Sequence, residues 1–569
     1  MRIRILAIAA IIALCTLPAH DAPAWEATTT HAGLTEQAAI TSKLHKRLKR
    51  QFNADRGLYT PLTIPPPDAR PLFQLLRTFN PSNGYVPDGR GRLYAIGWLA
   101  AGSVVADAPT SHAFNHFYNP LTKKGLSKRS YGLQHKWLAR WLGESLPSST
   151  ANAVGWLTDK RNPMNVTGFF SQYAKAVGAK TPAERSRHLA GALLAAGALL
   201  HLLQDMGSPS HVRDDVHAHL QKVSSRRDIG SRFERMAALS FGRLGIPSTK
   251  VSTAAPSLHG LFTNAKGTGL ADVTARSWFS ASTLPRAIKL DHITVRRIVA
   301  QVAAHYKTSP AAITNKPAKG AKASVARAMA IYLSVIHTSR KYTELAPMFG
   351  IKRTPPLLFA AASIIEGSKA DAKMAAAVST LKGAISAAAI GKRLDASLRT
   401  ANPAPLNTLD LAQARHPRGA RLVNADGVCV ARYRLRGRKL SWSLDDDCAL
   451  EQLRVILPKV ATHSAGAINW LFRGELTLLR KGNQLVISTH NVDFGKGTIT
   501  VLWDDNRGVR TAYDTLQTSG GKARTAIARS KMPPSKTKRV SVLFRGVDKQ
   551  GNPLTATGTV RWPPQSTSR

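Results

Sequence analysis

The sequence predicts a mainly α-helical protein that ends in a small all-β, sandwich-like module. Apolar residues recur with helical spacing over most of the chain up to about residue 393. After about residue 475, short strand-like runs alternate with turn signals. The chain has 569 residues, of which 43% are hydrophobic, so it can bury the cores of two or three domains.

The strongest helix candidate covers residues 184–206. Thr181 and Pro182 suit its N-cap and first turn, and Gly207 and Pro209 end it. Its stretch 189–203 is apolar nearly all round, which is typical of a helix at the centre of a bundle. Further helices are expected within 31–50, 93–105, 133–142, 231–244, 291–306, 323–345 and 355–393.

Strand-like runs occupy 476–479, 485–488, 498–503, 540–544 and 555–562, which predicts a β-sandwich over 475–569. Residues 400–448 are expected to be irregular or short-stranded. The helical part is expected to divide into a helical catalytic domain over 25–345 and a helical continuation with an irregular insertion over 346–474. Cys429 and Cys448 are expected to form a disulfide, which is the commoner fate of such a pair in an oxidising compartment.

The N-terminus has the pattern of a signal peptide. Arg2 and Arg4 form a basic region, 5–17 is an apolar run too short to span a bilayer, and Ala22-Pro23-Ala24 offers a small-residue cleavage site. We therefore expect residues 1–24 to be removed, Trp25 to become the N-terminus, and the protein to be secreted or periplasmic.

Lysine and arginine outnumber aspartate and glutamate by 80 to 33, giving a formal net charge of +47. Such a charge favours polyanions such as nucleic acid, acidic lipid or lipopolysaccharide. It is equally compatible with a merely solvated basic surface. The chain has no Gly-x-Ser-x-Gly elbow, Walker loop, Gly-x-Gly-x-x-Gly or zinc-finger spacing, which disfavours the corresponding enzyme and DNA-binding classes.

Histidine and aspartate are concentrated in a few segments. His201 and Asp205 are four residues apart on the apolar helix, so their side chains leave one face, one turn apart. This spacing suits a shared metal ion, although a His–Asp hydrogen bond would also compensate a buried carboxylate. Other candidates are His211 with the following His217 and His219, the group Asp107, His112 and His116, and His31 with the α-amine that cleavage would free on Trp25.

The order Trp25, His31, Asp107, Asn115-His-Phe-Tyr, His201-x3-Asp205, Pro209-x-His211 and Phe233-Glu234 resembles the bacterial zinc-dependent phospholipases C. These are related to single-strand nucleases with the same trizinc site. The resemblance covers roughly residues 25–290. It implies a helical-bundle phosphodiesterase domain with three zinc ions.

Transferred to this sequence, the resemblance implies three ligand sets. The first zinc ion would take the amine and carbonyl of Trp25, His31 and Asp205; the second Asp107, His116, His201 and Asp205; the third His211, Glu234 and one more histidine. The family's usual His-x3-Glu reads Gly230-Ser-Arg-Phe-Glu234 here. His217 is the first substitute for the missing histidine and His219 the next, or the third site is weak or empty. The position of His112 is often arginine in the family.

The implied reaction is attack of a zinc-bound hydroxide on phosphorus, with Asp107 orienting or deprotonating the water. The expected activity is that of a phospholipase C, which releases diacylglycerol and a phosphorylated head group. A nuclease of the same superfamily and a catalytically weakened secreted binding protein are the alternatives. A phospholipid or membrane surface is the expected partner, with nucleic acid or another polyanion second; no protein partner is implied.

Overall fold

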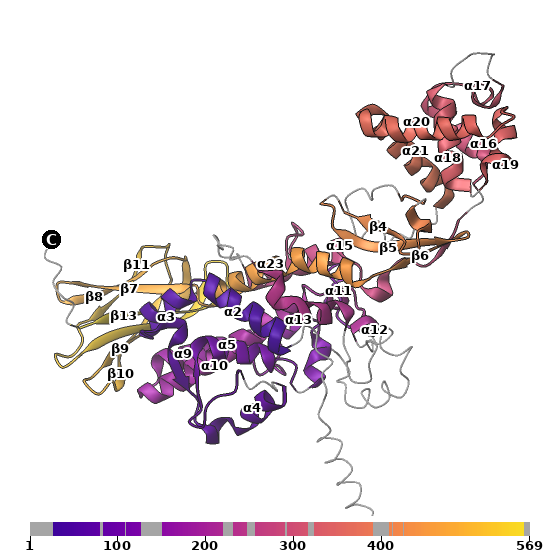
Figure 1. Ribbon diagram of the computed structural model, residues 1–569. Coiled ribbons are helices and arrows are strands. Elements are labelled where there is room, and N and C mark those ends of the chain that lie inside the picture. The colour runs from indigo at the N-terminus through magenta and orange to yellow at the C-terminus, as the bar shows by residue number, and fades with distance from the viewer. Residues whose placement is uncertain are drawn as a thin grey trace, which may run out of the picture. The chain divides into compact units, whose positions relative to one another are not determined.

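The computed structural model describes residues 27–79, 84–108, 110–126, 151–219, 231–246, 257–290, 293–316, 324–338, 340–390, 409–411, 413–424 and 426–562 (Figure 1). The predicted signal peptide 1–24, Trp25 and the helix expected at 133–142 lie outside these residues. The chain divides into two compact units. Unit 1 comprises 1–275 and 453–569, and unit 2 comprises 276–452. The domain boundary expected at 345 falls inside unit 2, at the end of helix α19 (Tyr342–Leu345).

Helix α10 (Pro182–Asp205) is the centre of unit 1, with α5 (Ala95–Val104) and α9 (Val166–Gly178) packed against it (Figure 1). The predicted start is confirmed, because Thr181 and Glu184 form a capping box. Gly197 lets α10 approach α5 closely: a Cβ there would lie 1.9 Å from the backbone oxygen of Leu99. This close packing aligns the C-terminal turn of α10 with the end of α5.

The remaining helices of unit 1 surround this core. The helix expected over 31–50 is two helices that break at Ser42, where the chain turns extended. The main elements are η1 (Ala27–His31), α2 (Ala32–Thr41), α3 (Leu44–Phe52), α4 (Pro66–Phe79), η3 (Thr110–Asn115), α11 (Pro209–Val212), α12 (Val216–His219), α13 (Arg232–Leu244) and α15 (Leu270–Ser277).

Among the described helices, α10 alone has the length and apolar composition needed to cross a bilayer. However, 78% of its most apolar 18-residue window is buried inside the protein. A helix buried in the core of a protein can also be this long and this apolar, and the burial of α10 is typical of such a core helix.

The C-terminal part of unit 1 is one seven-stranded, nearly closed sheet rather than the expected two-sheet sandwich. Its order is β10-β9-β12-β13-β7-β8-β11. The outer strands β10 and β11 approach each other, and the hydroxyl of Thr518 donates to the carbonyl of Ile527 at 2.9 Å. Register shifts in the β9–β10, β9–β12 and β8–β11 pairs mark bulges, which increase twist and allow one sheet to curl upon itself. The strands are β7 (Gly474–Lys481), β8 (Gln484–Thr489), β9 (Phe494–Asp504), β10 (Arg510–Thr518), β11 (Ala526–Lys531), β12 (Arg539–Asp548) and β13 (Pro553–Arg561).

Unit 2 contains a helical cluster and a small sheet (Figure 1). The helices are α16 (Val295–His305), α18 (Val325–Thr338), α20 (Pro355–Ala370) and α21 (Ala372–Ile390). The sheet has the order β3-β6-β5-β4, with β3 (Ile288–Lys289), β6 (Lys439–Ser443), β5 (Cys429–Arg436) and β4 (Ala420–Val423). The strands β4 to β6 lie in the segment that was expected to be irregular or short-stranded.

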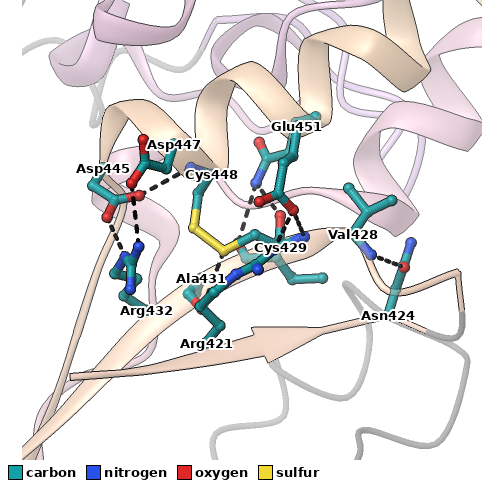
Figure 2. Close-up of a disulfide and its surroundings, with 12 residues drawn as sticks. Arg421, Asn424, Val428, Cys429, Ala431, Arg432, Asp445, Asp447, Cys448 and Glu451 are labelled. Carbon is teal, nitrogen blue, oxygen red and sulfur yellow. Dashed lines mark hydrogen bonds and ion pairs between the residues drawn. A yellow bond between two sulfur atoms is a disulfide. The ribbon is translucent and has the colours of Figure 1, made fainter. Parts of the chain in front are cut away.

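The expected disulfide between Cys429 and Cys448 is present, with the two Cα atoms 4.9 Å apart (Figure 2). It joins the start of β5 to the first turn of α23 (Asp446–Leu471). Around it, Glu451 accepts a hydrogen bond from the backbone of Cys429 at 3.0 Å, and Arg432 pairs with Asp445 (Figure 2). A disulfide points to an oxidising, extracytoplasmic environment.

Candidate metal centre

The C-terminal turn of α10 presents His201 and Asp205 on one face, as their spacing predicts, and both are fully buried. Three further side chains meet them there. His31 ends η1, Asp107 follows α5, and His116 follows η3. Two groups of possible ligands result: His31, His201 and Asp205, and Asp107, His116 and His201. These groups adjoin, because they share His201.

Asp205 lies between the two groups. Its Oδ1 is 3.4 Å from Nε2 of His31. Its Oδ2 is 3.0 Å from Nδ1 of His116 and 3.3 Å from Nε2 of His201. Asp107 closes the second group, with its Oδ1 at 3.0 Å from Nδ1 of His116 and 3.4 Å from Nε2 of His201. The two oxygens of one carboxylate therefore face different partners, which is the arrangement of a bridging ligand.

A third group joins His211, His219 and Glu234. His211 lies in α11, His219 ends α12, and Glu234 stands in the first turn of α13. Nε2 of His211 is 3.6 Å from Oε1 of Glu234, and Nδ1 of His219 is 3.4 Å from Oε2. His219, the second of the two substitutes considered for the missing histidine, thus lies with the other two; the side chain of His217 lies outside the described residues.

The atoms that face one another in these groups are buried and have no hydrogen-bond partner among the described residues. Buried polar atoms are almost always paired, because leaving them unpaired costs free energy. A concentration of such atoms at a few points is therefore compatible with sites that could hold metal ions. The atoms are Nε2 of His31, His201 and His211, Nδ1 of His116 and His219, Oδ1 of Asp107, both carboxylate oxygens of Asp205 and Oε2 of Glu234.

The other ring nitrogen of three of these histidines is held by the protein. Nδ1 of His31 lies 2.7 Å from Oε1 of Gln204, and Nδ1 of His201 lies 2.7 Å from the carbonyl oxygen of Ser103. Nδ1 of His211 lies 3.2 Å from the carbonyl oxygen of His116. Because each partner accepts, the ring proton is on Nδ1 and the lone pair of Nε2 points into the cluster. This is the orientation that supporting residues give to metal-binding histidines.

The pKa shifts agree with a compensating cation. Burial, and next the charge of His201, lowers the pKa of His31, whose ring stacks on that of His201 at 3.7 Å between centroids. Burial also lowers the pKa of His211 to about 4. Burial opposes the charged forms of His201 and Asp205 as well, but their attraction outweighs it, raising the pKa of His201 and lowering that of Asp205. Without a metal, a proton on His201 offsets the carboxylates, and a bound metal ion would replace that proton.

The structure brings together every predicted ligand whose side chain it describes. His112 lies outside the three groups, and its ring packs edge-on against Trp156 at 5.2 Å. Sequence reasoning missed the supporting residues Gln204 and Ser103, since neither type nor spacing sets them apart. All donors are nitrogen or oxygen, a set that suits zinc and other borderline divalent ions.

No protein-family model matches the chain, and no match to a curated protein was found. The resemblance to a family therefore rests on the order of the motif residues alone. The geometry shows a helical region with buried groups of histidine and carboxylate side chains that could hold metal ions.

Proposed function

We propose that this protein is a secreted, zinc-dependent phosphodiester hydrolase of the phospholipase C type. The observation that carries the proposal is the position of Asp205, whose two oxygens face His31 on one side and His116 with His201 on the other. A carboxylate shared between adjoining ion sites is typical of enzymes that hydrolyse phosphate esters with paired metals.

The proposed ligand sets combine the three groups with the resemblance in motif order. His31 and Asp205, with the amine of Trp25, would hold one ion, and Asp107, His116, His201 and Asp205 a second. A third ion would be held by the group of α11, α12 and α13. In this group His219 would take the place of the histidine that the family has where this chain has Gly230. Bound zinc supplies a water of lowered pKa and positive charge that stabilises the phosphate in the transition state.

Asp107 is the member best placed to orient the attacking water. Its side chain is 15% exposed, whereas those of His116, His201 and Asp205 are at most 1% exposed. It is therefore the ligand that solvent and substrate can approach. Attraction to His201 and His116 outweighs burial and holds the pKa of Asp107 well below its usual value, so the carboxylate is ionised. An ionised carboxylate can accept a hydrogen bond from the attacking water and so orient it, and so low a pKa makes this orienting role stronger than that of a proton acceptor.

Two alternatives have their own supporting observations. The net charge of +47 favours a nuclease of the same superfamily, because nucleic acid attracts such a surface. Gly230 favours a weakened binding protein. The position of His219 beside Glu234 argues against that weakening, because it restores a third ligand.

The test combines metal analysis with two substrates. Purified mature protein should contain zinc, release phosphocholine from phosphatidylcholine and lose this activity on chelation. Single-stranded DNA is the competing substrate. Digestion of DNA without head-group release would establish the nuclease instead, and zinc-replete protein inert on both would support the binding protein. Asp107→Asn should lower turnover and also the zinc content of the second ligand set, because Asp107 is one of the ligands of that set.

A further inference from the structure

A second polar site lies in unit 1, at a cleft where helices meet the nearly closed sheet. The cleft encloses about 580 Å³. Its walls come from α3, the strand β1 (Pro61–Thr63), the start of α10, the β9–β10 turn, and the ends of β12 and β13. It shares no residue with the candidate metal centre.

Most of the charged side chains in the lining are basic. They are Arg185, Arg510, Lys538, Arg539 and Arg561, against the carboxylates Asp504 and Asp505. Both carboxylates are already used. Arg510 binds Asp504 through two hydrogen bonds of 2.6 and 2.8 Å, and Asp505 accepts from two backbone amides of its own turn. Burial, and next the charge of Arg510, lowers the pKa of Arg185 to about 10, and Arg539 acts in the same direction.

Arg539 and Arg561 are the informative pair. The register of β12 and β13 places them directly opposite each other, at the ends of the two strands. Like charges directly opposite on a sheet destabilise it, because their side chains leave the same face about 5 Å apart. Among the described residues, neither side chain has an ion pair or a hydrogen bond. The opposing register places Asp504 beside Arg539 as well, but its oxygens are held by Arg510.

One further donor points to a ligand here. Thr60 lines the cleft, and its hydroxyl is buried and has no hydrogen-bond partner in the described part of the chain. An oxygen-rich anion would accept from this hydroxyl and would compensate the facing guanidinium groups. Arginine forks bind pairs of oxygens on phosphate or carboxylate groups, and a phosphate has enough oxygens to meet two arginines and a hydroxyl at once.

We propose that this cleft binds a phosphate group, held mainly by Arg539 and Arg561 with Lys538 at its edge. The group is a free phosphate or the phosphomonoester head of an anionic lipid. The bound anion would offset the repulsion between the two opposed arginines and tie the sheet to the helical part of unit 1. The site is separate from the metal centre and does not depend on its chemistry.

The test uses the full mature protein with its metal bound and the double variant Arg539→Gln/Arg561→Gln. A matched control, Arg529→Gln/Lys531→Gln, removes the same charge from β11, outside the cleft. Binding of inorganic phosphate is measured by calorimetry, and binding to phosphatidylcholine vesicles with and without phosphatidic acid by sedimentation. The cleft variant should bind phosphate at least tenfold more weakly at this site, while the control and the metal content stay unchanged.

Thermal unfolding gives a second readout that does not depend on the metal. Added phosphate should raise the midpoint of the wild type and of the control, but not that of the cleft variant. Without phosphate the cleft variant should be as stable as the wild type or more stable, because the opposed charges are gone. If the protein binds vesicles only when they contain phosphatidic acid, and the cleft variant does not bind them, the ligand is a lipid head group. If the protein binds inorganic phosphate but not these vesicles, the ligand is free phosphate. Equal phosphate binding in all three proteins, or equal loss in the cleft variant and the control, overturns the proposal.

Discussion

Replacing Asp205 by asparagine should remove metal from both groups that this carboxylate faces. The amide keeps the size of the side chain but not its charge. One of its ends becomes an NH2 group, which cannot bind a metal ion. Because the two oxygens lie 3.0 to 3.4 Å from His31, His116 and His201, the change affects both sides of the shared site.

The magnitude follows from these distances. A unit charge at 3.0 to 3.4 Å from another contributes about 5 kcal/mol at an effective dielectric constant near 20. A divalent ion in the same place loses at least that attraction. Since about 1.4 kcal/mol is tenfold in an equilibrium constant, metal affinity should fall by more than about 10³-fold.

Bound zinc is measured by elemental analysis after dialysis, and turnover on phosphatidylcholine is measured in the same samples. Asp272→Asn is the matched control, since Asp272 is buried in unit 1 and accepts hydrogen bonds from Thr263 and Asn264 away from the metal groups. Zinc content should fall by more than one ion per chain in the Asp205 variant and by none in the control. A variant at Asp205 that keeps full zinc and normal turnover would refute the bridging role.

Four further outcomes are expected. His219→Gln should release one zinc ion and leave the others, as elemental analysis would show; unchanged content would assign the third site to another ligand. Burial lowers the pKa of His337 to about 4, from the usual value near 6.5, so its neutral form stabilises the fold above pH 6.5 and this contribution, roughly 3 kcal/mol, is lost as the pH falls toward 4. Denaturant unfolding from pH 7 to 4 should therefore show a loss of stability that is smaller by about this amount in His337→Phe than in the wild type, because His211 contributes to the loss in both. Thiol titration of the denatured, unreduced protein should find no free Cys429 or Cys448, and reduction should lower stability by about 2–4 kcal/mol. N-terminal sequencing of secreted protein should begin at Trp25, and an earlier start would rule out its amine as a ligand.

The central helix α10 and its pair of candidate ligands could be predicted, because both depend on residues close together in the sequence. The capping residues Thr181 and Glu184 and the apolar run define α10, and its period of 3.6 residues places His201 beside Asp205. The disulfide followed from the compartment and the number of cysteines. Five of the seven strands of the final sheet were expected, whereas β10 and β11 were missed because exposed residues interrupt their apolar pattern.

Long-range contacts decided the rest. The sandwich was expected from strand runs alone, but closure of a sheet depends on bulges and on which strands become neighbours, and neither is encoded within one strand. The position of His219 beside Glu234 depends on how α12 and α13 pack, which the spacing of the residues along the chain does not show.

The types of the candidate ligands, the helix that carries His201 and Asp205, and the cysteine pair could be read along the chain. These follow from side-chain chemistry and from the geometry of a single helix. Folding of distant segments brings His31, Asp107 and His116 to the end of that helix, and it places Arg539 opposite Arg561 on neighbouring strands. The physical reason is that packing of distant segments is set by the burial of apolar surface over the whole unit, which no local pattern records.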